Sequence, residues 1–361
     1  MSSTWGNNIH ISVFGESHGG GIGVVISGFP SGLELDMEAI HREMARRKPG
    51  TGKHTTTRSE ADLVEILSGV HQGKTTGAPI CGMIRNTDTK SGDYAELQIL
   101  PRPGHADYSG GIRYHGFNDP RGGGHFSGRL TAPLVFAGEI CRQYLEIQGL
   151  AIGSHLQSIQ HVIDCPFDPC NVGEKELDIL RSMLVPVNDR SCVKEMLDVV
   201  EDARVAMNSV GGVIETAVIG LKPGFGSPMF HSIEARLASF LFSVPAVKGV
   251  EFGDGFALST MTGLQANDAF YMDKGQVKTR TNHNGGINGG ISNGMPIIFR
   301  TVIKPTSSIF LEQDTVNLET GMDAKLSVKG RHDPCIAIRA VPVLDAVTAI
   351  VLLDVILDPN P

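Results

Sequence analysis

The most constraining stretch of this sequence is its C-terminal end, where a long apolar segment runs from Pro342 to about Leu357. Proline is favoured in the first turn of a helix, and we predict that Pro342 opens a helix here. Apolar residues fall on nearly all of its faces, and a helix without a polar face has to be covered by other elements. The segment therefore predicts a buried core helix, which a chain of 361 residues is long enough to enclose.

Glycine is unusually frequent: 44 of the 361 residues are glycine, about 12%, against roughly 7% in average proteins. Much of the excess is clustered, near 19–23, 122–124, 211–212 and 285–294. The clusters show no collagen period and no low-complexity tract, so they indicate tight turns and close approaches of the backbone to a ligand. We therefore expect a substantial ligand pocket.

Charge and cysteine usage disfavour several function classes. The formal net charge of -8 argues against a surface that binds nucleic acid throughout. The six cysteines form no CxxC pair and no Cys/His metal spacing, so we expect no structural metal and no disulfide framework, and a reducing cytoplasm fits best. No signal-like start and no run of 18 apolar residues occurs, so no membrane partner is expected.

The first glycine cluster follows a short apolar run, 9–14, that predicts a strand. Gly15, Glu16, Ser17 and His18 then bring a carboxylate, a hydroxyl and an imidazole to the end of that strand. Such a segment is typical of an active-site wall, and equally of a glycine-rich turn with a solvated histidine. The remaining motifs have to decide between these interpretations.

Hydrophobic periodicity predicts a mixed α and β protein. Strands are expected at 24–26, 213–221 and 296–303. Helices are expected at 37–48 after the N-cap Asp36, at 131–148 with Thr131 as its cap, and at 173–184, 191–208 and 230–242. The order strand, Pro-Gly turn and helix occurs twice, at 24–47 and at 213–242, which suggests an internal duplication.

Basic residues gather at the end of the first of these helices, between 42 and 58. They either complement the helix dipole or form an anion-binding edge. The segment 49–54 resembles a phosphate loop, but it lacks the first glycine and the hydroxyl residue after the lysine. Nucleotide hydrolysis is therefore not expected.

The segment 101–131 is polar, rich in glycine and without a clear apolar period. A connector of that length is uncommon in a compact domain, so we expect a functional loop. Its cations and imidazoles suit a small polyanionic substrate, with arginines on carboxylate or phosphate and histidines supplying protons. The residues concerned are Arg102, His105, Asp107, Arg113, His115, Arg121, His125, Ser127 and Arg129.

Two later motifs add polar groups. The turn 304–308, a lysine and a proline followed by three hydroxyl residues, suits a cradle for one phosphate group, or is a plain capped turn. Asp333 stands near Arg331 and Arg339, which would keep it ionised, either as a base or as part of a structural ion pair. The glycine cluster at 282–294 lacks the dinucleotide-binding spacing, although a flat ring would fit against its backbone.

Together these motifs resemble the chorismate synthase family. Three signature regions match, at 15–30, 124–138 and 331–343, and shorter ones match at 102–108, 289–294 and 304–309. The resemblance covers essentially the whole chain. It implies a carbon-oxygen lyase that converts 5-enolpyruvylshikimate 3-phosphate to chorismate and phosphate, the last step of the shikimate pathway. This 1,4-elimination needs reduced FMN, without net oxidation.

The resemblance also implies an architecture that the local pattern does not predict. It is an α+β fold in which residues 1–361 form a single domain, a β-α-β sandwich whose sheets enclose long helices. The family further implies a homotetramer in the cytoplasm that acts on a small molecule, with the basic loops at 46–58 and 101–129 over the pocket.

Catalytic roles follow from the same resemblance. His18 would protonate the flavin, with Ser17 in a proton relay. His105 would act on the leaving phosphate. Asp333 would help to accept the proton that ends on flavin N5. Glu16 receives no chemical role.

Binding roles are implied in the same way. FMN contacts are expected from His125, Phe126, Ser127, Pro245, Ala246, Gly289, Lys304, Pro305, Thr306, Ser307, Ser308 and Arg331. Substrate contacts are expected from Arg46, Arg47, Arg129 and Arg339. Arg47 and Lys53 match positions associated with nicotinamide nucleotides, so NADPH would be a reductant of the flavin, unless the reduced flavin comes from an external source.

The chain departs from the family pattern at a few positions. Lys53 stands where many members have arginine, which loses a bidentate fork. The pair His125-Phe126 replaces a more polar pair, and Asp345 stands where glutamate is common. Two other functions remain alternatives: a flavin-dependent reductase, which would oxidise a nicotinamide cofactor in step with product, and a non-catalytic binder, which would not need two imidazoles on separate loops.

Overall fold

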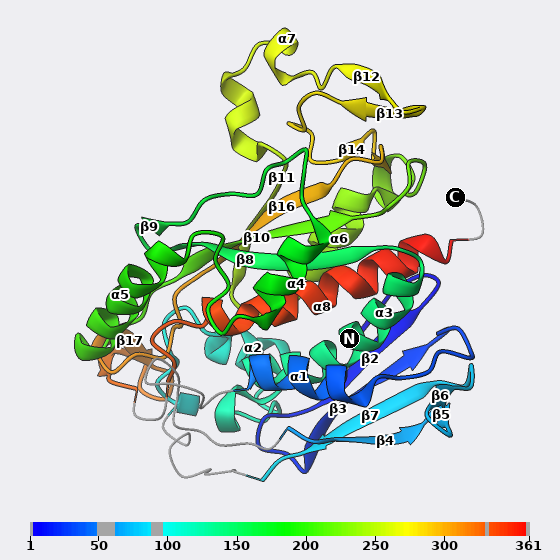
Figure 1. The fold of residues 1–361 in the computed structure, drawn as a ribbon. Coiled ribbons are helices and arrows are strands. Elements are labelled where there is room, and N and C mark those ends of the chain that lie inside the picture. The colour runs from blue at the N-terminus through cyan, green and yellow to red at the C-terminus, as the bar shows by residue number, and fades with distance from the viewer. Residues whose placement is uncertain (1–2, 49–61, 88–96, 329–331, 359–361) are drawn as a thin grey trace.

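The computed structural model describes residues 3–48, 62–87, 97–328 and 332–358, and Figure 1 shows the course of the chain. Two five-stranded antiparallel sheets form its outer layers. The first has the order β1 (Thr4–Trp5), β2 (His10–Gly15), β3 (Gly21–Ser27), β7 (Ile80–Arg85) and β4 (Val64–Ser68). The second has the order β11 (Val247–Phe252), β16 (Ile297–Ile303), β10 (Gly212–Ile219), β8 (Ala151–Ile159) and β9 (Val162–Ile163).

Helices fill the space between the sheets, as Figure 1 shows for α8 (Ala337–Ile356) and α3 (Thr131–Ile147). α3 contacts β3 and β7 on one side and α8 on the other, and α8 in turn contacts β8 and β10. α1 (Met37–Arg47) and α6 (Ile233–Leu241) pack beside this pair. The arrangement is the expected α+β fold, a sandwich of two sheets with helices inside.

Smaller elements lie around these layers. α4 (Glu174–Ser182) packs on β8, and α5 (Val193–Val205) lies next to it in the chain. Hairpins are formed by β5 (Val70–His71) with β6 (Lys74–Thr75), β12 (Phe270–Asp273) with β13 (Gln276–Thr279), β14 (Ile287–Asn288) with β15 (Ile291–Ser292), and β17 (Gln313–Asn317) with β18 (Met322–Leu326). The remaining helices are the short α2 (Asp107–Arg113) and α7 (Gly263–Ala266).

The buried C-terminal helix is confirmed, because every residue of α8 from Ala340 to Val355 is buried. Its expected start is wrong. The helix begins at Ala337, and Pro342 lies inside it. The segment before the proline continues the helix, which carries Arg339 toward the pocket described below. No helix in the described part of the chain is both long enough and apolar enough to cross a membrane.

The two buried carboxylates of α8 are hydrogen-bonded to neighbouring elements. Asp354 accepts hydrogen bonds from the backbone N–H groups of residues 7–9, at 3.0, 2.6 and 2.9 Å, and pairs with Arg236 of α6 at 2.9 Å. Asp345 accepts from the Ser154 hydroxyl of β8 at 2.6 Å. Because buried polar groups are costly when unpaired, these contacts fix the helix against the N-terminal strands and against the second sheet.

The other expectations for caps and loops agree with the structure in part. Asp36 caps α1, accepting from the backbone N–H of Ala39 at 2.9 Å. Thr131 is the first residue of α3 rather than its cap. The polar stretch 101–131 is not a plain loop, since it contains α2 and two 3-10 turns.

The suggested duplication also has a counterpart in the fold. β3 and β10 are each the central strand of their own sheet. Each is followed by a helix, α1 or α6, that packs against α8.

The two central helices are in close contact at one glycine. A Cβ atom placed on Gly138 of α3 would lie 2.3 Å from the Cβ of Ala346 and 2.4 Å from its Cα. Real carbon atoms do not approach so closely without overlap. The crossing of α3 and α8 therefore requires glycine at this position.

Gly138→Ala should force the two helices apart and lower the free energy of unfolding by about 1–3 kcal/mol or more, the usual cost of overpacking a core. Urea unfolding would measure the loss. Gly173→Ala is a matched control, because Gly173 precedes α4 and has open space around its Cβ position. Equal stabilities of the two variants would contradict a tight crossing.

Candidate active site

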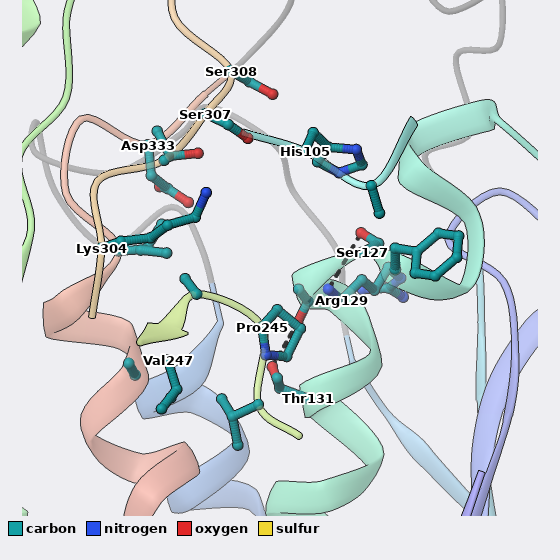
Figure 2. Close-up of a pocket in the computed structure, with 18 of the residues that line it drawn as sticks. His105, Ser127, Arg129, Thr131, Pro245, Val247, Lys304, Ser307, Ser308 and Asp333 are labelled. Carbon is teal, nitrogen blue, oxygen red and sulfur yellow. Dashed lines mark hydrogen bonds between the residues drawn. The ribbon is translucent and has the colours of Figure 1, made fainter. Parts of the chain in front are cut away.

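A cavity of about 620 Å³ opens where the N-terminal ends of α3 and α8 meet. Binding pockets for small molecules commonly have volumes of 300–1,000 Å³, roughly this size. Segments distant in the sequence line it. Figure 2 shows His105, Ser127 and Arg129 across the cavity from Lys304 and Asp333, with Ser307 and Ser308 above and Pro245 and Val247 below in this view. The expected convergence of the 101–131 and 304–308 segments is thus present.

Three arginines line the cavity near the start of α3 and α8: Arg47, Arg129 and Arg339. Arg47 and Arg129 share one carboxylate, since their Nη1 atoms donate to the two oxygens of Asp62 at 3.0 and 2.8 Å. The side chains of Arg47, Arg129 and Asp62 are almost completely buried. Burial and the neighbouring Arg339 lower the pKa of Arg47 to about 9, so the guanidinium stays charged at neutral pH.

The shared carboxylate does not neutralise the cluster. Arg339 donates to the backbone oxygen of Arg47 at 2.9 Å and pairs with Asp333 through its Nη1 atom. Among the residues that the structure describes, two carboxylates, Asp62 and Asp333, thus face three guanidinium groups. Such a concentration of guanidinium groups in a largely buried site favours an anionic ligand.

Asp333 is therefore in an ion pair and also lines the cavity. The two interpretations that the sequence left open for this residue are both compatible with its position. The expected neighbour Arg331 lies outside the described residues.

His105 lies across the cavity from Asp333, and its imidazole is held in place by neighbouring side chains. Its Nδ1 atom is 2.6 Å from the Asp107 carboxylate, which also accepts from Nε and Nη2 of Arg102 at 2.7 Å each. Arg102 then donates from Nη1 to the Ser308 hydroxyl at 3.0 Å. Lys304 joins the same two segments by donating to the backbone oxygen of Gly104 at 2.6 Å.

His18 and Ser17 lie beneath the lining, in the turn between β2 and β3. A Cβ atom on the cavity residue Gly122 would lie 2.0 Å from Nδ1 of His18 and 2.8 Å from Oγ of Ser17. Only a glycine can fit there, and its φ of 59° is in the left-handed region. The turn that carries His18 is therefore part of the site, separated from the cavity by the backbone of Gly122.

The next glycine makes the same kind of contact with the other histidine. A Cβ on Gly123 would lie 3.3 Å from Cε1 and Nε2 of His105. The run Gly122–Gly124, all with positive φ, thus passes between the two imidazoles. From the sequence, we expected this glycine cluster to bring the backbone close to a ligand. In the structure, its backbone lies close to two side chains of the protein, His18 and His105.

Other expected cofactor residues occupy the cavity wall. These are His125, Phe126, Ser127, Pro245, Ala246, Lys304, Pro305, Thr306, Ser307 and Ser308. Both ring nitrogens of His125 are engaged, with the backbone oxygen of Gly15 at 2.8 Å and the hydroxyl of Ser3 at 3.0 Å. His125 thus also anchors the lining to the end of β2.

Some expected residues are not at the cavity. Arg46 instead pairs with Glu43 at 2.6 Å and with Asp345 at 3.5 Å, between α1 and α8. Gly289 lies in the β14–β15 hairpin and does not line the cavity. Lys53 lies outside the described residues, as does most of the basic loop 46–58.

The structure also shows residues that the motifs did not single out. Asp62 joins two of the arginines, as described above. Asn86 accepts from Nε of Arg129 at 2.7 Å and donates to the backbone oxygens of Glu16 and Gly19 at 2.9 Å each. It thereby links the arginine cluster to the turn that carries His18. Neither residue stands in a distinctive local pattern, so only a comparison of many sequences could have drawn attention to them.

A sandwich of this kind, whose pocket presents guanidinium, ammonium and imidazole groups, is suited to an enzyme that acts on a small polyanion. Within the residues the structure describes, no cluster of three His, Cys, Asp or Glu side chains could hold a metal ion. Comparison with known proteins narrows the class. The family model for chorismate synthase matches residues 9–357, and the chain belongs to the chorismate synthase family.

Individual relatives agree over nearly the full length. The chain is 44% identical over 349 residues to the chorismate synthase of Thermococcus kodakarensis, covering 97% of this chain and 96% of that protein. It is 47% identical over 352 residues to that of Aeropyrum pernix, covering 98% and 92%. A solved structure described as a chorismate synthase superposes with a TM-score of 0.76 at 28% identity, covering 98% of this chain and 93% of the other.

Gly122→Ala should displace His18 and strain the backbone, because a side chain at this φ costs about 1–3 kcal/mol. We expect a loss of that size in the free energy of unfolding and a shift of the His18 imidazole signals in NMR spectra. Gly111→Ala, in α2 with open space around its Cβ position, should change neither. Unchanged His18 signals in Gly122→Ala would contradict the contact.

Proposed function

We propose that the cavity is the active site in which this enzyme converts 5-enolpyruvylshikimate 3-phosphate to chorismate and phosphate by 1,4-elimination. The chain is a carbon-oxygen lyase of the shikimate pathway, which supplies aromatic amino acid biosynthesis. One observation carries the placement: two imidazoles, His18 and His105, lie on either side of one glycine run at the edge of an arginine-lined cavity.

The cavity fits the reduced FMN that the family uses. The turn 304–308 offers one ammonium group and three hydroxyls to a phosphate, as the sequence suggested, while Phe126, Pro245 and Ala246 offer apolar surface to a flat ring. Reduced FMN, when bound, supplies electron density that helps to expel the allylic phosphate and takes up the hydrogen from C6, so no net oxidation occurs.

The residues of the chain would then divide the remaining work. Arg47, Arg129 and Arg339 bind the phosphate and carboxylate groups of the substrate, because all three guanidinium groups line the same cavity and match such anions in shape and charge. Arg46 is withdrawn from this set, since its charge is used by Glu43 and Asp345.

Proton handling falls to four side chains. His105 gives a proton to the departing phosphate, whose negative charge would otherwise make it a poor leaving group. His18, behind Gly122, holds a proton for the flavin, with Ser17 next to it in the relay. Asp333 would help to accept the proton that ends on flavin N5, and its ion pair with Arg339 keeps that guanidinium oriented.

NADPH is proposed only as a reductant of the flavin, through Arg47 and Lys53. The guanidinium of Arg47 is already held by Asp62, Thr131 and Gly128, at 3.0, 3.1 and 3.2 Å. A nicotinamide nucleotide would therefore meet this group only at its remaining exposed edge.

Anaerobic incubation with dithionite-reduced FMN and the enolpyruvyl phosphate should release phosphate and form chorismate in equal amounts. His105→Ala should lower kcat by about 10²- to 10⁴-fold, the usual contribution of a general acid. His161→Ala is the control, because His161 lies on the exposed turn between β8 and β9.

Each alternative gives a different result in that assay. A reductase would consume NADPH in step with product, and a binding protein would release no phosphate. Full activity of His105→Ala would contradict the role given to His105.

We further propose that residues 1–361 form a single domain and that four copies assemble in the cytoplasm. Large apolar side chains are strongly exposed on the segment that contains α7 and β12: Phe256 (84%), Leu264 (91%), Phe270 (68%) and Met272 (66%). Figure 1 shows that α7, β12 and β13 extend away from the layered body. Exposed apolar clusters of this kind are typical of surfaces that pair with another protein.

Light scattering with size-exclusion chromatography should therefore give a mass of four chains. Phe256→Asp together with Phe270→Asp should reduce that mass, because burying unpaired charge at an apolar contact is unfavourable. Leu184→Asp, exposed elsewhere on the molecule, should not. A monomeric wild-type protein would contradict the assembly, and an intact tetramer in the double variant would contradict this surface.

A further inference from the structure

We propose that Asp107 is a positioning residue for the elimination: it holds His105 in the one tautomer that can deliver a proton through Nε2, and it offsets the charge of Arg102 beside the ring. The inference rests on the proposed role of His105 in that reaction. Asp107 belongs to the polar segment 101–131, and the sequence alone indicated no chemical role for it.

The Asp107 carboxylate is fixed by four contacts. Its Oδ2 atom accepts from the backbone N–H of Arg102 at 3.0 Å and from Nε at 2.7 Å. Its Oδ1 atom accepts from Nη2 of Arg102 at 2.7 Å and lies 2.6 Å from Nδ1 of His105. Because both oxygens are occupied and the side chain is only 11% exposed, the carboxylate has little freedom to turn.

This geometry determines which ring nitrogen is protonated in the neutral form of His105. An ionised carboxylate can only accept hydrogen bonds, so Nδ1 must be the donor in the 2.6 Å contact. Nε2 is then the unprotonated ring nitrogen, which lies 3.3 Å from Nη2 of Arg102 and is the one that can exchange a proton. A carboxylate that orients an imidazole in this way is a common device for fixing the tautomer of a catalytic histidine.

The carboxylate remains ionised in the folded protein. Burial alone would raise the pKa of Asp107, but the hydrogen bonds from Arg102 and His105 outweigh burial and lower it. A carboxyl group with a lowered pKa keeps its charge above its usual titration range and loses it only as the pH falls through the lowered value. Asp107 therefore carries its negative charge throughout the neutral range.

Arg102 explains why that charge is needed. Its Nη2 atom lies 3.0 Å from Nδ1 and 3.3 Å from Nε2 of His105, so the guanidinium is in direct contact with the imidazole. The Asp107 carboxylate is in contact with both groups and offsets the charge of the guanidinium. Without that carboxylate, the His105 ring would lie against Arg102 alone, and Nδ1 would lose the acceptor that fixes its tautomer.

Asp107→Asn tests the inference because it keeps the size of the side chain and removes its charge. We expect kcat for chorismate formation to fall by about 10²-fold, near the lower end of what a general acid contributes, with KM changed less than threefold. Asp107→Glu, which restores the charge, should recover most of the rate.

Two measurements separate this role from a merely structural one. Calorimetric titration of the FMN-loaded protein with inorganic phosphate should show equal or tighter binding in Asp107→Asn, since a negative charge has been removed near the anion. In ¹⁵N spectra of histidine-labelled protein, the His105 signal should change from the Nδ1–H tautomer toward the Nε2–H tautomer. His105→Gln identifies that signal.

Asp254→Asn is a matched control. Asp254 makes the same kind of contact, 2.5 Å from Nδ1 of His283, but lies outside the cavity. Its variant should keep the wild-type rate.

The outcomes distinguish the inference from the function on which it rests. A wild-type rate in Asp107→Asn, with His105→Ala inactive, would overturn the inference and leave the function intact. Loss of phosphate binding together with the loss of rate would also overturn it, because that combination indicates a collapsed segment. If the wild-type protein formed no chorismate, the proposed function would fail, while the nitrogen spectra would still report whether Asp107 selects the tautomer.

Discussion

The structure depends on the close packing of α3 against α8. Both helices lie between two sheets, and α8 has almost no polar face to present to water. Gly138 lets the two backbones come together at Ala346, which no larger residue would allow. Because the helices are in contact along their length, their N-terminal ends lie side by side, and the cavity is formed there.

Charge at that end is arranged by a small number of buried carboxylates. Asp62 holds Arg47 and Arg129, and Asp333 holds Arg339. The three arginines are thereby kept in place at the cavity, and such a cluster of guanidinium groups suits a substrate with several negative charges. The protein has retained charges in a buried region, where unpaired ions are costly, and this is common at functional sites.

Comparison of sequence and structure shows where local reasoning succeeds. The strand at β2, the capped helix α1 and the buried helix α8 depend on periodicity and on capping residues near them in the chain, and all were predicted. Arg46 and Arg47 show where such reasoning ends. They are neighbours in α1 and equally basic, yet Arg47 lines the cavity while Arg46 pairs with Glu43 and Asp345 inside the fold. Successive residues of a helix point about 100° apart, roughly 360° divided by 3.6, so only the packing of α1 decides which one meets the ligand.

The sequence by itself determined the family, the sheet-and-helix composition and the identity of most cavity residues, because these depend on motifs and on local hydrophobic patterns. The tertiary structure alone decided how the motifs meet. It placed Gly122 against His18 and Gly123 against His105, joined two arginines through Asp62, and set Asp107 behind His105. The physical reason is that the contacts with His18 and the shared carboxylate join residues far apart in the chain. Asp107 and His105 are close in sequence, but the role of this pair depends on Arg102 and on the cavity that His105 lines. Such contacts leave no periodic trace in the sequence, whereas a helix or strand repeats its pattern at every turn.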